Sequence, residues 1–218
     1  MKQLGQVCVA MMLLTLVAAE SSKAQVEFNL GPKLGLNFAT VSFSPDLVLA
    51  PGVTKGGRTT FMIGAFGELG FLHMFYVALE PGYVSHGFVL TQGAATQTVS
   101  ASYLQIPILF KVKFLRGMVR PYAFVGPNIG FNLSATSTIA GVGPGVDGDT
   151  DIKANTSSTN FALDFGGGAE VKVAPMISLV GDIRYSLGLS NINSTPGVTQ
   201  TSETRGFQIL VGASFHIM

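Results

Sequence analysis

The sequence predicts an all-β protein, an eight-stranded antiparallel up-and-down β-barrel that spans a membrane. Hydrophobic residues make up 47% of the 218 residues and charged residues only 11%, against roughly 25% charged residues in an average soluble domain. Beyond the first two dozen residues, no apolar run approaches the ~18 residues that a spanning helix needs. The apolar residues instead recur at every second position, which favours strands over membrane helices.

Eight strands follow from this period-two alternation and from its β-branched and aromatic residues. They are expected at approximately 26–38, 58–70, 74–88, 99–113, 118–135, 158–172, 176–190 and 204–217. Short turns follow the second, fourth and sixth strands, whereas longer segments rich in Gly, Ser, Thr and Asn follow the others. This alternation is typical of bacterial outer-membrane barrels, whose short turns lie on the periplasmic side.

Residues 1–24 are expected to be a cleaved signal peptide, which leaves 25–218 as one outer-membrane barrel domain. A basic start, an apolar segment of about a dozen residues and small residues at Ser22 and Ala24 support cleavage after Ala24. The remaining chain has no cysteine and equal numbers of basic and acidic residues. We therefore expect no disulfides and no nucleic-acid partner, because such a partner favours a basic face.

Glycine distinguishes the two faces of the predicted strands. A soluble barrel also alternates, but a solvated face has little use for many glycines in strands, whereas a crowded lumen does. Ten strand glycines share the polar phase: Gly31, Gly35, Gly64, Gly82, Gly126, Gly130, Gly166, Gly168, Gly188 and Gly212. We therefore expect the polar face to line the lumen and the apolar face to contact outer-membrane lipid.

Eleven charged residues share this inward phase, and we expect them to form a luminal charge network. They are Lys33, Glu68, Glu80, Lys111, Lys113, Arg120, Asp164, Glu170, Lys172, Asp182 and Arg184. An isolated buried charge costs several kcal/mol, so these groups should pair and fill the barrel. A charge-lined conduit or solute site is the alternative, although an eight-stranded barrel is only just wide enough for its own side chains.

Six segments resemble the PorT-type outer-membrane β-barrel domain, a family of small exported barrels. They are GPKLGLN at 31–37, EPGY at 80–83, YLQIPILFK at 103–111, RPYAFVGP at 120–127, DFGGG at 164–168 and RYSLGL at 184–189. The resemblance covers nearly the whole chain after the signal peptide and implies an outer-membrane, eight-stranded barrel. It implies no established activity: the family's namesake is associated with protein secretion across the outer membrane, and most relatives have no assigned role.

Two loop motifs are weak candidates for ligand sites. Residues 143–148 match the letters of a dinucleotide fingerprint, but no strand precedes them and no helix follows, so the match is accidental. Asp147, Asp149 and Asp151 have the spacing of the first ligands of an EF-hand, yet Ile152 and Ser158 replace its glycine and final glutamate. We expect a solvated acidic loop, with loose binding of a divalent cation as the alternative.

A catalytic site is not expected. Small outer-membrane barrels that act on lipid use a serine nucleophile beside a histidine, and Ser85 is adjacent to His86. Neighbours in a strand point to opposite faces, so these two cannot be partners. A pair between His86 and Ser102 or Ser134 on another strand stays open.

The sequence thus predicts a structural or interaction role in the outer membrane of a Gram-negative cell, without catalysis, cofactor or metal. Loops 39–57 and 136–157 are the expected contact surfaces for protein partners, because long loops on a rigid scaffold usually carry binding. Two alternatives are a narrow passive channel for small solutes and an accessory component of a secretion assembly.

Overall fold

The computed structural model describes residues 26–45, 49–194 and 200–217, so the signal peptide expected at 1–24 lies outside the described residues. This part of the chain forms ten strands and a short 3-10 helix. They are β1 (Glu27–Ser44), β2 (Val53–Phe71), β3 (Phe75–Leu79), β4 (Gly82–Gln92), β5 (Ala95–Lys113), β6 (Val119–Ala140), β7 (Gly148–Asp151), η2 (Lys153–Asn155), β8 (Thr159–Ala174), β9 (Ile177–Gly188) and β10 (Thr201–His216). Within these ranges, no helix is long and apolar enough to span a membrane.

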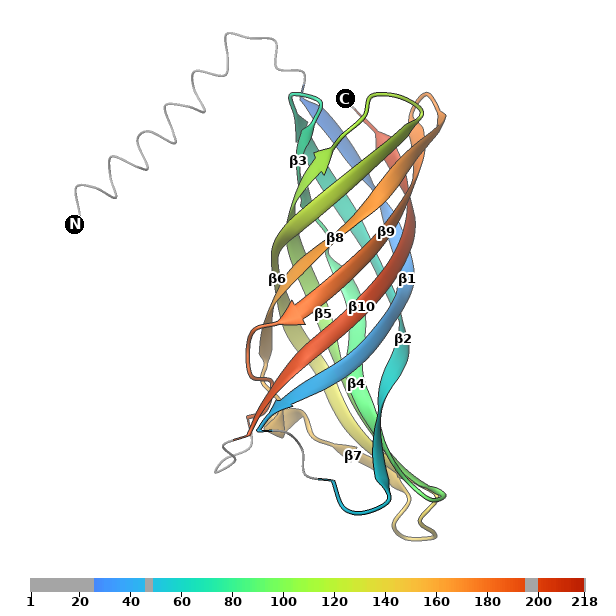
Figure 1. The fold of residues 1–218 in the computed structure, drawn as a ribbon, viewed down its shortest axis with the longest axis vertical. Coiled ribbons are helices and arrows are strands. Elements are labelled where there is room, and N and C mark those ends of the chain that lie inside the picture. The colour runs from blue at the N-terminus through green and yellow to red at the C-terminus, as the bar shows by residue number, and fades with distance from the viewer. Residues whose placement is uncertain (1–25, 46–48, 195–199, 218) are drawn as a thin grey trace, which may run out of the picture.

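The strands form one antiparallel up-and-down barrel, as predicted (Figure 1). The hydrogen-bonded order runs β1–β2–β4–β5–β6–β8–β9–β10, and β10 then pairs with β1 to close the ring. Each ladder in this ring is antiparallel. Closure leaves these strands without a free edge, so their backbone groups pair with one another, as a bilayer interior demands.

The single strand expected at 74–88 is divided into β3 and β4 by Glu80 and Pro81. Both pieces pair with β2 on one side and β5 on the other. Proline has no N–H to donate, so the regular ladder is interrupted there. The carbonyl of Pro81 still accepts the amide of Ala65 at 2.9 Å, and the Glu80 amide donates to the carbonyl of Pro107 at 3.0 Å. The break therefore leaves Glu80 fixed between two strands.

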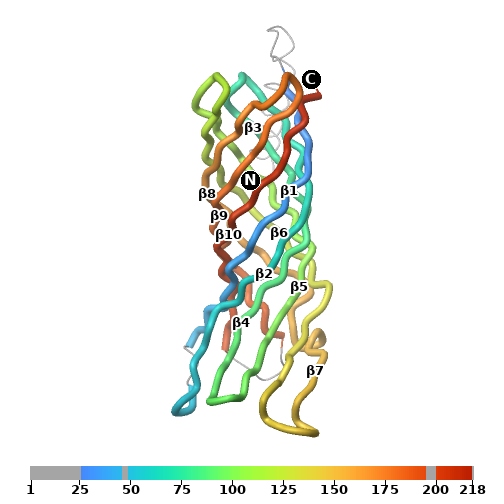
Figure 2. Tube along the Cα trace, turned by 90° about the vertical axis from the view of Figure 1, so that its right-hand side faces the viewer, coloured from blue at the N-terminus to red at the C-terminus, as the bar shows by residue number. Residues whose placement is uncertain are grey.

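The expected loops 39–57 and 136–157 are longer than the corresponding loops of the structure. Strand β1 continues to Ser44 and β2 already starts at Val53, while 136–157 contains the end of β6, all of β7 and η2. Threonine and valine in these segments favour strands. The strands can continue past the lipid-facing belt, because their backbone hydrogen bonds do not depend on contact with lipid. The hairpins therefore extend the barrel wall at the end opposite the short turns (Figure 2).

The two ends of the barrel differ. Short turns connect β2 to β3, β5 to β6 and β8 to β9 at one end, here called the short-turn end, which also holds Glu27 and His216. The other end, here called the long-loop end, carries the connections between β1 and β2, β4 and β5, β6 and β8, and β9 and β10. The longer segment expected after the third strand was wrong, because β4 and β5 continue into it and leave only Gly93 and Ala94 as a tight turn. In Figure 1 the short-turn end is at the top.

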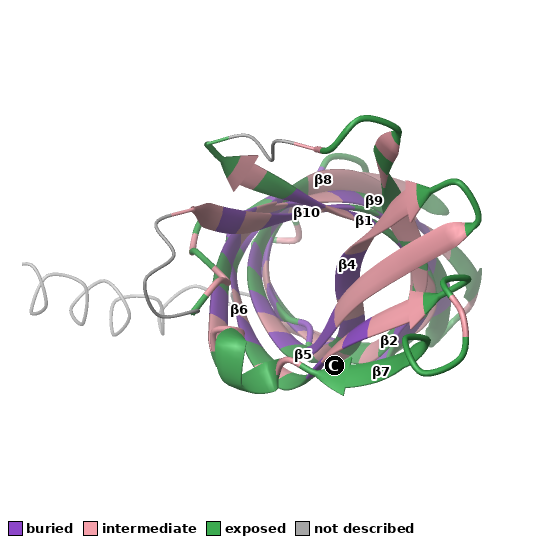
Figure 3. Cartoon of the chain, turned by 90° about the horizontal axis from the view of Figure 1, so that it is seen from below, coloured by how far each residue is buried: buried purple, intermediate pink, exposed green. Residues whose placement is uncertain are grey.

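Large apolar side chains cover the outside of the barrel and buried polar and charged ones line much of the inside, the reverse of a soluble protein. Phe61 is 81% exposed and Ile63 is 65% exposed, whereas Asn29, Asn37 and Gln208 are fully buried. Seen along the barrel, buried positions alternate with exposed ones around the ring (Figure 3). The outer belt matches the apolar band of an outer-membrane barrel, and the polar interior matches its lumen.

Two glycines show why the inward face needs residues without side chains. A Cβ atom at Gly31 would lie 1.7 Å from the carbonyl oxygen of Ala213, and one at Gly126 would lie 1.9 Å from that of Ile108. Both clashes are with the backbone of a neighbouring strand. Crowding was predicted for this face, but it comes from the close approach of coiled strands as much as from luminal side chains.

Candidate functional site

Glu80 is the centre of a group of buried charges that cross the lumen. Its carboxylate lies 2.9 Å from Lys33 Nζ and 2.7 Å from Lys111 Nζ, and it also accepts a hydrogen bond from Arg184. These side chains come from β1, β5 and β9, and the break at Pro81 positions Glu80 between them. Three cations on one carboxylate offset the cost of removing its charge from water.

The group continues towards the short-turn end through Glu68. Lys111 Nζ lies 3.5 Å from one Glu68 oxygen, and Lys113 Nζ lies 2.5 Å from the other. Lys113 also contacts Glu170 at 2.5 Å. Each carboxylate and each ammonium in this part of the lumen therefore has at least one partner of opposite charge.

Asp182 and Asp164 extend the group in the other direction. Asp182 lies 2.6 Å from Lys33 Nζ and accepts a hydrogen bond from the Tyr122 hydroxyl. Asp164 lies 3.6 Å from Arg184 Nη1 and accepts a hydrogen bond from Asn128 at 3.0 Å. Nine of the eleven predicted residues are thus buried and joined by ion pairs, and we call these nine the luminal network: Lys33, Glu68, Glu80, Lys111, Lys113, Asp164, Glu170, Asp182 and Arg184.

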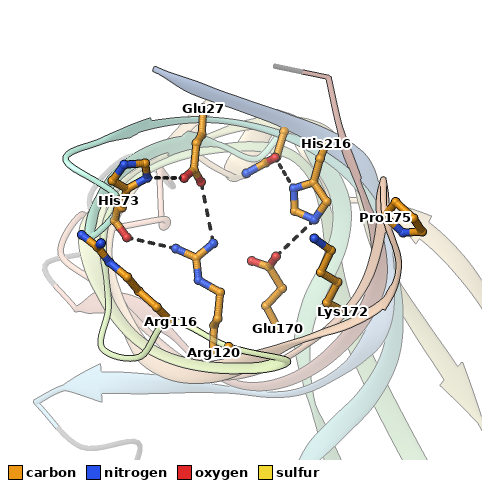
Figure 4. Close-up of a pocket in the computed structure, with 10 residues that line it drawn as sticks. Glu27, His73, Arg116, Arg120, Glu170, Lys172, Pro175 and His216 are labelled. Carbon is orange, nitrogen blue, oxygen red and sulfur yellow. Dashed lines mark hydrogen bonds and ion pairs between the residues drawn. The ribbon is translucent and has the colours of Figure 1, made fainter. Parts of the chain in front are cut away.

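Arg120 and Lys172, the other two predicted residues, lie at the short-turn end and outside the luminal network (Figure 4). Arg120 Nη2 donates to the Tyr76 hydroxyl at 2.7 Å, and Nη1 lies 3.7 Å from Glu27. Lys172 is exposed. Glu27 was not among the predicted residues, although it shares the odd-numbered, inward phase of Lys33 in the first strand and could have been found by that signal.

A chain of side-chain contacts joins β9, β10 and β1 where the ring closes. His216 Nε2 lies 2.7 Å from Ser178 Oγ, and His216 Nδ1 lies 2.6 Å from Asn29 Oδ1. The order serine, histidine, amide resembles that of a catalytic triad. Ser178 is 0% exposed, however, so a substrate has no access to its hydroxyl. The contacts of His216 with Ser178 and Asn29 instead hold β9, β10 and β1 together, and we call them the latch.

An apolar cluster lies in the lumen between the luminal network and the long-loop end. It consists of Met62, Val84, Ala101, Tyr103, Ala135 and Leu210, with Ile152 packed against it. His86 lies beside it, with its ring centroid 5.9 Å from that of Tyr103, and its Nε2 is 3.1 Å from the amide nitrogen of Gln105. The structure does not bring His86 to either candidate serine, because Ser102 bonds to Tyr83 and Ser134 is exposed.

Two loop segments meet across the long-loop end. The Ser157 amide donates to the Ile192 carbonyl at 2.8 Å, and the Ser194 amide donates to the Asn155 carbonyl at 3.0 Å. The Ile152 amide donates to the Ala135 carbonyl at 3.0 Å, which ties the first segment to the wall. These contacts place 152–157 and 192–194 next to a cavity of 260 Å³ that also contacts His86.

The three loop aspartates do not converge on one point. Asp147 accepts hydrogen bonds from the amides of Gly143, Val142 and Gly141, and these bonds hold its pKa below the ordinary value of 3.8. Asp149 accepts from Thr138, and Asp151 accepts from the Lys153 amide. Across the described ranges, no three His, Cys, Asp or Glu residues are grouped so that they could hold a metal ion.

Solved structures similar to this chain are small outer-membrane barrels. Neisserial surface protein A is 15% identical, with a TM-score of 0.51 over 86% of this chain and 96% of the other. OprG of Pseudomonas aeruginosa is 11% identical, with a TM-score of 0.52 over 89% and 97%. A major outer membrane protein of Thermus thermophilus is 13% identical, with a TM-score of 0.51 over 88% and 100%. At these identities the likeness shows the fold alone.

The family model for the outer membrane protein beta-barrel domain matches residues 20–194, most of the chain. No curated protein matches the sequence. The family match and the similar structures agree with the apolar outer belt and the polar lumen. The chain therefore belongs to the outer membrane protein beta-barrel domain family and resides in the outer membrane.

Proposed function

We propose that this protein is an eight-stranded integral barrel with a structural or interaction role, and that it has neither catalytic activity nor a cofactor. The strand count rests on the ring of pairings, in which β3 and β4 act as one interrupted strand and β7 stands outside. The proposal includes export by the signal peptide at 1–24 and membership of the PorT type, on the sequence resemblance.

The observation that best supports a structural role is that charged side chains fill the middle of the lumen. The luminal network has four basic and five acidic residues, each in an ion pair with another member. Breaking one buried pair costs about 3–5 kcal/mol, because it leaves a charge without a partner. A conducting path would have to displace these side chains and also pass the apolar cluster around Tyr103 and Leu210. We therefore favour a scaffold over the narrow channel.

Planar-bilayer recording of the purified, refolded protein tests this choice. We expect no reproducible unitary conductance from the wild type. Steady unitary steps that change in Glu80→Ala or Lys111→Ala would support the channel instead. Lys153→Ala, at an exposed residue of η2, is the control for a change of charge away from the lumen.

Protein partners would contact the tips of the long-loop end, the parts of 39–57 and 136–157 that remain outside the strands. One such tip is the turn 141–147 between β6 and β7, which holds the exposed residues Val142 and Val146. Pull-down from native envelopes in mild detergent, with the wild type and with a variant in which Gly and Ser replace 141–147, tests this role. Partners lost only from the variant support it. Secretion proteins recovered equally with both would favour the accessory role in a secretion assembly.

A further inference from the structure

A cavity of about 450 Å³ opens at the short-turn end of the lumen, and we call it the mouth pocket. Its walls include Glu27, Arg116, Arg120, Glu170, Lys172 and His216 (Figure 4). The luminal network forms its floor, since Glu170 belongs to both. Short turns of outer-membrane barrels face the periplasm, so this pocket is open to periplasmic solutes.

The two carboxylates of the mouth pocket already have cationic partners in the protein. Glu27 lies 3.7 Å from Arg120 Nη1, accepts a hydrogen bond from the Tyr76 hydroxyl at 2.5 Å and lies 2.8 Å from His73 Nδ1. Glu170 lies 2.5 Å from Lys113 Nζ and 3.4 Å from His216 Nε2. Neither carboxylate therefore leaves a strong negative charge to repel an anion.

The three permanent cations of the pocket keep free hydrogen-bond donors. Arg116 and Lys172 are exposed, and within the described residues their side chains make no hydrogen bond or ion pair. Arg120 is fixed through Nη2 by Tyr76 and the His73 carbonyl, whereas its Nη1, 3.7 Å from Glu27, makes no hydrogen bond within the described residues. These charged donors are available to the oxygens of a ligand.

We propose that the mouth pocket binds a phosphate group, with Arg116, Lys172 and Arg120 as its donors. Guanidinium groups recognise the oxygens of phosphate by charge-assisted hydrogen bonds, and lysine adds a point charge. The excess of cations and the low-dielectric walls of the barrel concentrate anions at the opening. The ligand is a soluble periplasmic phosphate or the phosphodiester of a phospholipid headgroup at the inner surface of the membrane.

Titration calorimetry of the refolded barrel with inorganic phosphate tests the site. We expect saturable binding that weakens about tenfold in Arg116→Ala and in Lys172→Ala, as for the loss of one charged hydrogen bond, and that disappears in the double variant. Both residues are exposed and outside the luminal network, so the variants should fold. Lys153→Ala, at the other end of the barrel, should bind phosphate like the wild type.

A second arm separates the two sources of phosphate. The wild type and the double variant are mixed with phosphatidylglycerol in detergent, and retained lipid is counted by native mass spectrometry. The headgroup is the ligand if the wild type retains lipid, the double variant does not, and inorganic phosphate displaces the lipid from the wild type. Binding of inorganic phosphate alone assigns a soluble ligand. The proposal would be overturned if the wild type bound neither inorganic phosphate nor lipid, or if the wild type and the double variant bound them equally.

Discussion

His216 Nδ1 lies 2.6 Å from Asn29 Oδ1, and the two residues face each other in the ladder that pairs the last strand with the first. The same imidazole contacts Ser178 on β9. One side chain thus connects three strands at the seam where the ends of the barrel meet. Asn29 and Ser178 are fully buried while the imidazole of His216 is in place, so His216 supplies hydrogen bonds to polar groups that water does not reach.

Replacing His216 with alanine should therefore destabilise the barrel by about 1–3 kcal/mol, the usual cost of leaving buried polar groups without partners. Urea unfolding in lipid vesicles, followed by circular dichroism, measures this change. His73→Ala is the control, since the His73 side chain is 33% exposed and its loss should cost less than about 1 kcal/mol. Equal effects of the two variants would contradict the latch.

Glu80→Gln should be far more damaging than an equivalent change at the surface. It removes the charge that Lys33, Lys111 and Arg184 share, and the expected loss is about 3–5 kcal/mol. Glu203→Gln is the matched control, because the Glu203 side chain is 37% exposed and its one ion pair among the described residues is with Arg205, so its loss should cost at most about 1 kcal/mol. Unfolding curves that coincide for the two variants would show that the luminal network does not stabilise the barrel.

Gly31→Ala should prevent efficient folding or lower the free energy of unfolding by about 3 kcal/mol or more. The reason is that the new Cβ atom would overlap the Ala213 carbonyl and force the strands apart. At Gly67 the nearest atom to an added Cβ is Phe28 Cε2 at 4.0 Å, so Gly67→Ala should change stability by less than about 1 kcal/mol. The fraction refolded into vesicles, read from gel mobility without heating, compares the two. Efficient folding of Gly31→Ala would mean that the strands are less tightly coiled than described.

Asp147 should make the turn between β6 and β7 sensitive to acid. Its pKa is lowered by the hydrogen bonds from the Gly143 and Val142 amides, so its contribution is complete above the ordinary aspartate pKa of 3.8 and is lost as the pH falls through the lower pKa of the folded protein. Hydrogen exchange of those two amides, corrected for intrinsic rates, should be slow at neutral pH in the wild type.

In Asp147→Ala the same amides should exchange faster at neutral pH, and acidification should then have little further effect. Asp151→Ala serves as the control, since Asp151 accepts its hydrogen bond from Lys153 instead. If the Asp147 and Asp151 variants protect the Gly143 and Val142 amides equally well, Asp147 does not hold this turn.

The period-two pattern predicted strands with two different faces, because a pleated strand sends alternate side chains to opposite sides, and the glycines on the polar phase then assigned that face to the lumen. Leu34 and Phe110 could be assigned to lipid, and Lys33 and Lys111 to the lumen, on that basis alone. The pattern also placed Gly31 on the polar phase. It could not indicate that Gly31 meets the carbonyl of Ala213, because that contact depends on how closely two strands coil.

Composition, periodicity, the lengths of the connections and the positions of the strand glycines predicted an outer-membrane barrel with charged residues inside, since all of them are read directly along the chain. Tertiary structure alone decided that Glu80 collects three cations, that Arg120 and Lys172 leave the luminal network for the mouth pocket, and that Glu27 joins them. Strand register sets the height of each side chain along the barrel, and closure brings β1 beside β10. Neither register nor closure is encoded in the alternation of one strand, so only the closed ring places these charges together.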